Sequence, residues 1–144
     1  MKHVLPALFL LLACSACSIE DRIERREDRL LGTWEIDRAS YRDADDLFAD
    51  NVTGEFSGDY LIFYPDYSVI YETGDGRIYD GYWVINAITD LDDETEFTFD
   101  ADFFDARGRL AFQWLGTIDK LNRNRFRVSI YDRGGLLRLR WSKR

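Results

Sequence analysis

Histidine is almost absent from this chain of 144 residues, because His3 near the N-terminus is the only one. Without an imidazole farther along, the chain cannot form a Ser-His-Asp or Cys-His catalytic group, and it lacks the commonest general base and a frequent zinc ligand. The sequence also contains no glycine-rich phosphate loop of the P-loop or dinucleotide-binding pattern. Nothing in it fixes two carboxylates at a catalytic separation. We therefore expect no enzymatic activity and no cofactor.

Positive charge is also in deficit, with 19 lysines and arginines against 27 aspartates and glutamates and a formal net charge of -8. Phosphate backbones demand a basic face, so this balance excludes nucleic acid as a partner. It also disfavours attraction of the whole chain to anionic lipid headgroups. The acidic segments at residues 43–46 and 90–96 do not match the ligand spacing of a defined calcium loop. We interpret them as solvated turns without a metal, available to a protein partner.

Cysteine is confined to the N-terminal region, where Cys14 and Cys17 follow an apolar run at residues 4–13. The run, with Lys2 before it, is typical of a secretory signal. It is too short for a membrane span, which needs roughly 20 apolar residues. A disulfide between the two cysteines would close a small loop and stabilise little, and a C-x-x-C redox or zinc site needs a folded context that the sequence does not provide.

The segment around Cys14 resembles the lipobox of bacterial lipoproteins, with Leu11 three residues before it and Ala13 directly before it. The resemblance implies a diacylglycerol on the thiol, cleavage before the cysteine, and an acyl chain such as palmitate on the new amine. Cys14 is the preferred site. Cys17 stays open as the alternative, because the residues before it are also small.

The chain then divides into a signal at residues 1–13, or 1–16 if Cys17 is modified, a charged tether at 14–30 and one domain at 31–144. Removal of the signal takes away Lys2 and no acid, so the formal charge changes from -8 to -9. A thin apolar stripe at helical spacing predicts that the tether is a short solvated helix or a flexible spacer. No aspartate directly follows either cysteine, so we expect a lipid-anchored protein of the cell envelope, at the outer membrane.

From Gly32 onward the apolar residues alternate with polar ones, which predicts strands that bury one face each. Mostly tight turns join them, including Gly74-Asp75-Gly76. The link at residues 41–55 is long and acidic, as functional or disordered loops often are. The pattern predicts an all-β fold, an eight-stranded antiparallel up-and-down barrel, with strands at residues 32–37, 59–64, 68–73, 77–86, 94–104, 109–118, 125–132 and 136–141.

The start of the first strand, with Gly32 and Trp34, resembles the G-x-W signature of the lipocalin superfamily. The order of signal, lipobox, charged tether and L-x-G-T-W is similar to that of lipocalin-like lipoproteins of Bacteroidetes-type bacteria. The resemblance implies that Trp34 lies at the closed end of the barrel. It also implies that an arginine of the last strand, Arg138 or Arg140, packs across the Trp34 ring.

Two functions follow from a barrel of this kind. In the first, the anchored barrel binds a small apolar or amphipathic ligand, and the residues expected to line its cavity are Tyr60, Tyr71, Tyr82, Phe97, Phe112 and Trp114. In the second, large inward side chains fill the barrel, and the protein is a non-enzymatic interaction or structural lipoprotein, an accessory subunit or inhibitor. The number of large side chains that point inward distinguishes the two.

Lipidation can be tested by growing cells with an alkyne fatty acid and detecting label on the protein. We expect label on the wild-type chain and its loss in the double variant Cys14→Ser/Cys17→Ser. The two single variants identify the modified residue. Label that survives the double substitution, or no label on the wild type, would contradict the prediction.

Overall fold

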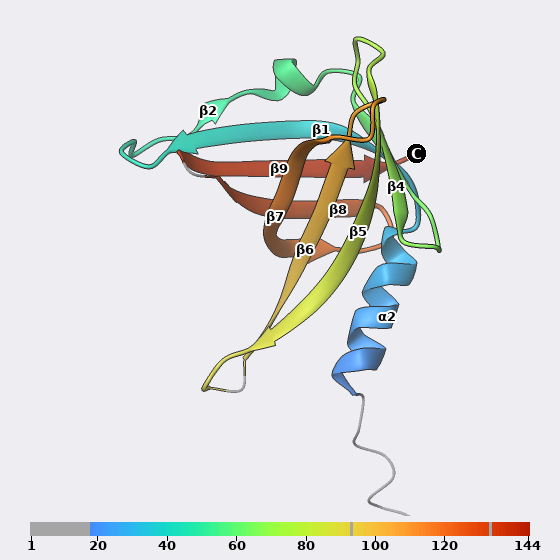
Figure 1. The fold of residues 1–144 in the computed structure, drawn as a ribbon. Coiled ribbons are helices and arrows are strands. Elements are labelled where there is room, and N and C mark those ends of the chain that lie inside the picture. The colour runs from blue at the N-terminus through green and yellow to red at the C-terminus, as the bar shows by residue number, and fades with distance from the viewer. Residues whose placement is uncertain (1–17, 93, 133) are drawn as a thin grey trace, which may run out of the picture.

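The alternating segments form nine strands within residues 18–92, 94–132 and 134–144, the part of the chain that the computed structural model describes (Figure 1). The predicted signal and both cysteines lie outside the described residues. The elements are the helix α2 (Ile19–Leu30), the short 3-10 helix η2 (Thr53–Phe56) and the strands β1 (Gly32–Asp43), β2 (Asp50–Asn51), β3 (Tyr60–Phe63), β4 (Ser68–Glu72), β5 (Ile78–Thr89), β6 (Thr95–Phe104), β7 (Leu110–Leu121), β8 (Arg125–Asp132) and β9 (Gly135–Lys143).

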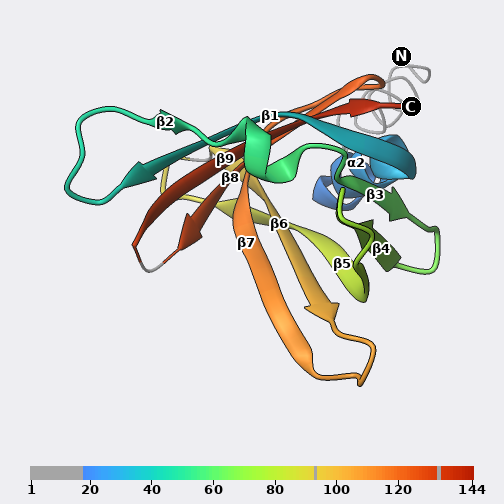
Figure 2. The same ribbon diagram turned by 90° about the horizontal axis from the view of Figure 1, so that it is seen from above.

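Eight of these strands form a closed antiparallel barrel in the order β1-β3-β4-β5-β6-β7-β8-β9, with β9 paired back to β1. Each strand pairs with its neighbour in the chain, apart from the inserted β2, so the predicted up-and-down barrel is confirmed. Seen from above, β1 and β9 cross one side of the molecule while β6 and β7 extend from the other (Figure 2). Closure leaves no long unpaired edge that could recruit another chain.

The acidic link between the first two barrel strands contains ordered structure. Its strand β2 pairs with Ser40 and Tyr41 of β1, and η2 follows it. The Thr53 hydroxyl donates to the Ala39 carbonyl at 3.2 Å and accepts from the Ala39 amide at 3.0 Å. These two bonds hold the second half of the link against β1, so only its tip projects as a loop.

The core consists of the inward faces of the strands, as the alternation predicts. The side chains of Trp34, Phe99 and Phe126 are fully buried, and all four tryptophans are at most 7% exposed. Three β-bulges interrupt the strand pairing, one in β1 between Ile36 and Arg38, one in β7 between Ile118 and Lys120, and one where β6 pairs with β7, between Phe103 and Phe104. A bulge adds one residue to one strand and so reverses which of the following side chains point outward.

The charged tether forms a helix, and its apolar stripe packs on the barrel. Ser18 caps the helix: its hydroxyl accepts from the Asp21 amide, and the Asp21 carboxylate accepts from the Ser18 amide, both at 3.2 Å. Leu30 in the last turn is fully buried, and Ile23 packs against the core. Within the described residues, no helix has both the length and the apolarity needed to cross a membrane.

Several contacts join the helix to the end of the barrel where β1 begins, among them a hydrogen bond from Lys143 to the Arg29 carbonyl at 3.3 Å. The Trp34 indole donates to the Leu30 carbonyl at 2.6 Å, which satisfies one carbonyl of the last helical turn. The Arg26 guanidinium lies over the Phe97 ring, 3.4 Å from its centre. Of the two alternatives for the tether, a solvated helix or a flexible spacer, the structure has a helix over Ile19–Leu30, and only one side of it is solvated, because the other side packs on the barrel.

We expect Leu30→Ala to reduce the free energy of unfolding by about 2 to 5 kcal/mol, since it leaves a cavity where the helix meets the barrel. Leu47→Ala is the matched control, because Leu47 is 87% exposed and the same truncation there should change stability by less than about 0.5 kcal/mol. Urea unfolding followed by tryptophan fluorescence measures both. Equal effects of the two substitutions would mean that the helix does not dock.

Candidate functional site

The six predicted cavity residues divide between the two sides of the barrel wall. Tyr71, Phe97 and Trp114 are buried and Phe112 packs partly buried against the core. Tyr82 is 65% exposed on the outer face of β5. The Tyr60 hydroxyl donates to the Glu72 carboxylate across the outer face of β3 and β4. Four of the six therefore point inward and two do not.

The inward rings fill the barrel by packing on one another. Near the open end, Phe103 and Phe112 stack with their centres 4.7 Å apart, and Tyr71 lies 5.3 Å from Trp114. Trp114 in turn lies 6.0 Å from Trp141. Near the closed end, Trp141 stacks on Phe126 at 4.7 Å, and Phe126 meets Phe99 edge to face at 5.4 Å. Aromatic contacts thus run from one end of the barrel to the other.

A buried polar contact sits where the barrel interior meets the open end. The Tyr71 hydroxyl donates to the Asp59 carboxylate, which also accepts from the Gly74 amide at 2.7 Å. Burial and this hydrogen bond raise the pKa of Tyr71 far above its usual value, so the phenol stays protonated. Through its two donors, Tyr71 and Gly74, the Asp59 carboxylate connects the segment after η2 to β4 and to the turn that follows it.

The cation at Trp34 is a lysine and not one of the two predicted arginines. The Lys143 ammonium lies 5.2 Å from the centre of the Trp34 ring. Side chains alternate along β9, so the buried Leu139 and Trp141 place Lys143 on the inner side at the strand end, while Arg138 and Arg140 point outward. The implied assignment of Arg138 or Arg140 to Trp34 is therefore wrong, whereas the predicted burial of Trp34 beside the last strand is confirmed.

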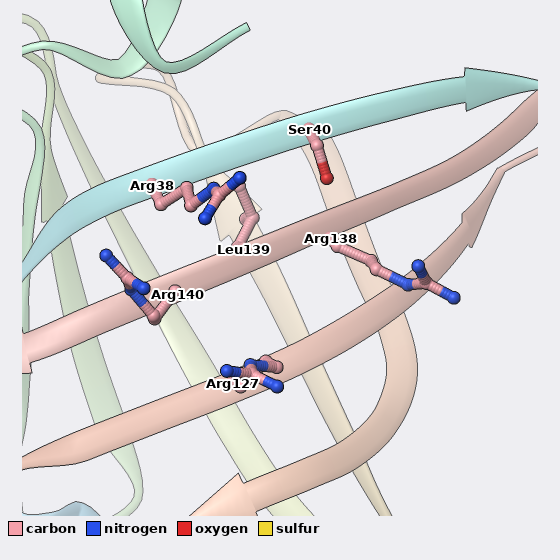
Figure 3. Close-up of a pocket in the computed structure, with 6 residues that line it drawn as sticks. All are labelled: Arg38, Ser40, Arg127, Arg138, Leu139 and Arg140. Carbon is pink, nitrogen blue, oxygen red and sulfur yellow. The ribbon is translucent and has the colours of Figure 1, made fainter. Parts of the chain in front are cut away.

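Arg138 and Arg140 instead line a hollow on the outer face of β1, β9 and β8 (Figure 3). Its volume is about 240 Å³, and its lining residues are Arg38, Ser40, Arg127, Arg138, Leu139 and Arg140. Arg140 is opposite Arg38 in one neighbouring strand and opposite Arg127 in the other. We call this site the arginine hollow.

One of the arginines that line the hollow is paired with a carboxylate. Asp37 accepts from the Arg140 guanidinium at 2.6 Å and from the Ser142 hydroxyl. Partial burial by itself would raise the pKa of Asp37, but the bonds from Arg140 and Ser142 outweigh burial, so the pKa lies below its ordinary value of 3.8. Asp37 is therefore ionised at neutral pH and neutralises Arg140.

The arginine hollow was not predicted from the sequence, although the sequence contains part of the pattern that forms it. The segments at residues 125–127 and 138–140 each carry two arginines at alternate positions, which places each pair on one outer face. Arg38 does not belong to such an alternating pair of arginines. Alternation from Trp34 and Ile36 would place Arg38 inside the barrel, and only the bulge in β1 turns it outward.

A second outer hollow, of about 440 Å³, lies over β4, β5 and the end of β6. Tyr82 and Phe104 form its aromatic wall, with ring centres 6.4 Å apart. In the strand order it is separated from the arginine hollow by β3 on one side and by β7 on the other. The outward position of Tyr82 therefore places it at a surface hollow and not at a cavity mouth.

The acidic segment at residues 90–96 forms a turn in which a side-chain carboxylate is bonded to nearby backbone amides. The Asp90 carboxylate accepts from the amides of Asp92 and Glu94 at 3.0 and 2.9 Å. Among the described residues, no three histidine, cysteine, aspartate or glutamate side chains are grouped in a way that could hold a metal ion.

None of the protein-family models, curated proteins or solved structures compared with the chain matches it. Functional assignment must therefore start from the chain's own residues.

The contact between Lys143 and Trp34 can be measured by a double-mutant cycle in urea. Trp34→Ala should cost about 3 to 5 kcal/mol, and its combination with Lys143→Gln should show a coupling of about 0.5 to 1 kcal/mol. Arg138→Gln is the control, since it removes a cation of the same strand that points outward. Its effect should add to that of Trp34→Ala within about 0.5 kcal/mol. Coupling to Arg138 and none to Lys143 would reverse the assignment.

Proposed function

We propose that this protein is a lipid-anchored, non-enzymatic envelope protein of lipocalin-like type that acts by binding a protein partner, with no small ligand inside its barrel. The observation that carries the proposal is the packed interior. Phe103, Phe112, Trp114, Trp141 and Phe126 are in ring contact along the barrel, at centre distances from 4.7 to 6.0 Å. An apolar ligand would have to displace aromatic rings that are already closely packed against one another.

The tip of the acidic link is the surface best suited to a partner. Leu47 and Phe48 are 87% and 84% exposed, although both are large apolar side chains. Aspartates surround them in the sequence, at positions 43, 45, 46 and 50. Exposed apolar residues with a polar rim are typical of protein interaction sites. A partner with an apolar pocket and a basic rim would complement this tip.

The position of the tip agrees with anchoring at the N-terminus. The link follows the end of β1, whereas α2 joins the start of the same strand. A chain held by a lipid before Ser18 therefore presents Leu47 and Phe48 at the end of β1 that is farther from its anchor (Figure 1).

The proposal can be tested in the host with a photo-crosslinking residue placed at Phe48 or, as the control, at Leu110, which is 58% exposed at the start of β7. We expect a single crosslinked partner from position 48, absent from position 110 and lost when Leu47→Ser is added. Native mass spectrometry of the purified protein should show polypeptide and lipid only. A stoichiometric small molecule that survives purification would contradict the filled barrel and favour the ligand-binding function.

A further inference from the structure

Four cations lie in one row across four strands on the outer face of the barrel. Arg38 of β1 is in register with Arg140 of β9, Arg140 with Arg127 of β8, and Arg127 with Lys120 of β7. Like charges directly opposite one another destabilise a sheet. The row is therefore a cost to folding, in a chain whose formal net charge is -8.

Two of the three β-bulges contribute to this row. The bulge at Asp37 turns Arg38 outward while Ala39 is fully buried, and the bulge at Asp119 turns Lys120 outward while Leu121 packs against the core. Without them, simple alternation would point both cations into the barrel. Bulges often re-aim side chains at functional sites, and here two separate ones extend a single row of positive charge.

Carboxylates neutralise the row only in part. Asp37 binds Arg140, and Asp119 accepts from the Ser129 hydroxyl at 2.7 Å. Within the described ranges, Arg38, Arg127, Arg138 and Lys120 form no salt bridge. Three of these, all arginines, line the arginine hollow together with the Ser40 hydroxyl (Figure 3).

We propose that the arginine hollow binds a phosphate group. Planar guanidinium groups match the geometry of phosphate oxygens and can donate two parallel hydrogen bonds to them. Arg38, Arg127 and Arg138 supply three such groups around a hollow of about 240 Å³, and Ser40 adds a hydroxyl. A phosphate bound there would offset the repulsion between the like-charged side chains of the row.

The acidity of the rest of the chain restricts what this group can be attached to. Exposed charges farther away than about 8 Å are largely screened at physiological salt, so a compact phosphate experiences mainly the local row. A long polyanion such as a nucleic acid would also pass over the acidic surface. The hollow therefore selects a single phosphate, carried either by a small soluble ester or by an anionic lipid headgroup.

The test uses the chain from Ser18 to Arg144, which contains every core residue that is buried in the described part of the structure, from Leu30 to Trp141. Inorganic phosphate is titrated at constant ionic strength while amide NMR shifts are recorded. We expect saturable shifts on β1, β8 and β9. Arg38→Gln/Arg127→Gln should weaken binding by about 100-fold, roughly tenfold for each lost charged donor.

Arg77→Gln/Arg109→Gln is the matched control. It removes the same charge from two exposed turn arginines that pair with Asp75 and Asp105, and it should bind phosphate as the wild type does. Equal weakening in both double variants would show that net charge and not the hollow is responsible, and would overturn the proposal. Absence of binding by the wild type to phosphate and to vesicles would overturn it as well.

Vesicles of phosphatidylcholine with and without phosphatidylglycerol show whether the bound phosphate belongs to a lipid headgroup or to a small soluble molecule. Binding to the anionic vesicles that Arg38→Gln/Arg127→Gln abolishes would identify a lipid phosphate, and binding to free phosphate alone a soluble one. If instead only an acidic peptide such as polyglutamate binds, the hollow recognises carboxylates and the proposal is wrong.

Thermal unfolding provides a second measurement that does not depend on detecting phosphate by NMR titration. In chloride, Arg127→Gln should raise the unfolding midpoint, because it removes a charge between two like neighbours. Added phosphate should raise the midpoint of the wild type and of the control variant, but not that of Arg38→Gln/Arg127→Gln beyond the general effect of an excluded salt. The same increase in all three proteins would contradict a specific site.

Discussion

Strand β1 is hydrogen-bonded on one edge to β9 and on the other to β3 and β2, and this pairing converts a meander into a barrel. A meander has two free edges, one at its first strand and one at its last, and both disappear when those strands pair. Closure also defines an inside. Every strand must then direct one set of side chains into a limited volume and the other set into solvent, so the contents of the core and the pattern of the outer surface both follow from this pairing.

The limited volume explains why the interior is solid. An eight-stranded barrel is just wide enough for its own side chains to fill it. Here the inward positions carry tryptophan, phenylalanine and tyrosine on most strands, and the rings meet edge to face or stacked. The helix α2 completes the closed end, where the Trp34 indole bonds to the Leu30 carbonyl. With the interior filled, the outer wall and the loops are the surfaces that contact solvent.

Much of the barrel follows from the sequence because alternation is a local property. The burial of Trp34, Phe99 and Phe126 can be read from every second residue, and the turns from their glycines. The positions of the cations depend on long-range register and could not be read in the same way. Lys143 reaches Trp34 only because β9 continues beyond Trp141 beside β1. Arg38 and Lys120 point outward only because of bulges, and the neighbouring sequence gives no pattern from which these bulges could be predicted.

The contact between α2 and the barrel has a mechanical consequence if the protein is held at its N-terminus, as the proposed anchoring requires. Tension applied before Ser18 reaches the barrel through the last turn of α2 and then through β1. Hydrogen bonds between antiparallel strands run perpendicular to the strands, so a pull along β1 loads them in shear, all together and on both edges. Such a load is resisted by the whole pairing with β9 and β3, whereas a pull across the sheet would open the bonds one after another.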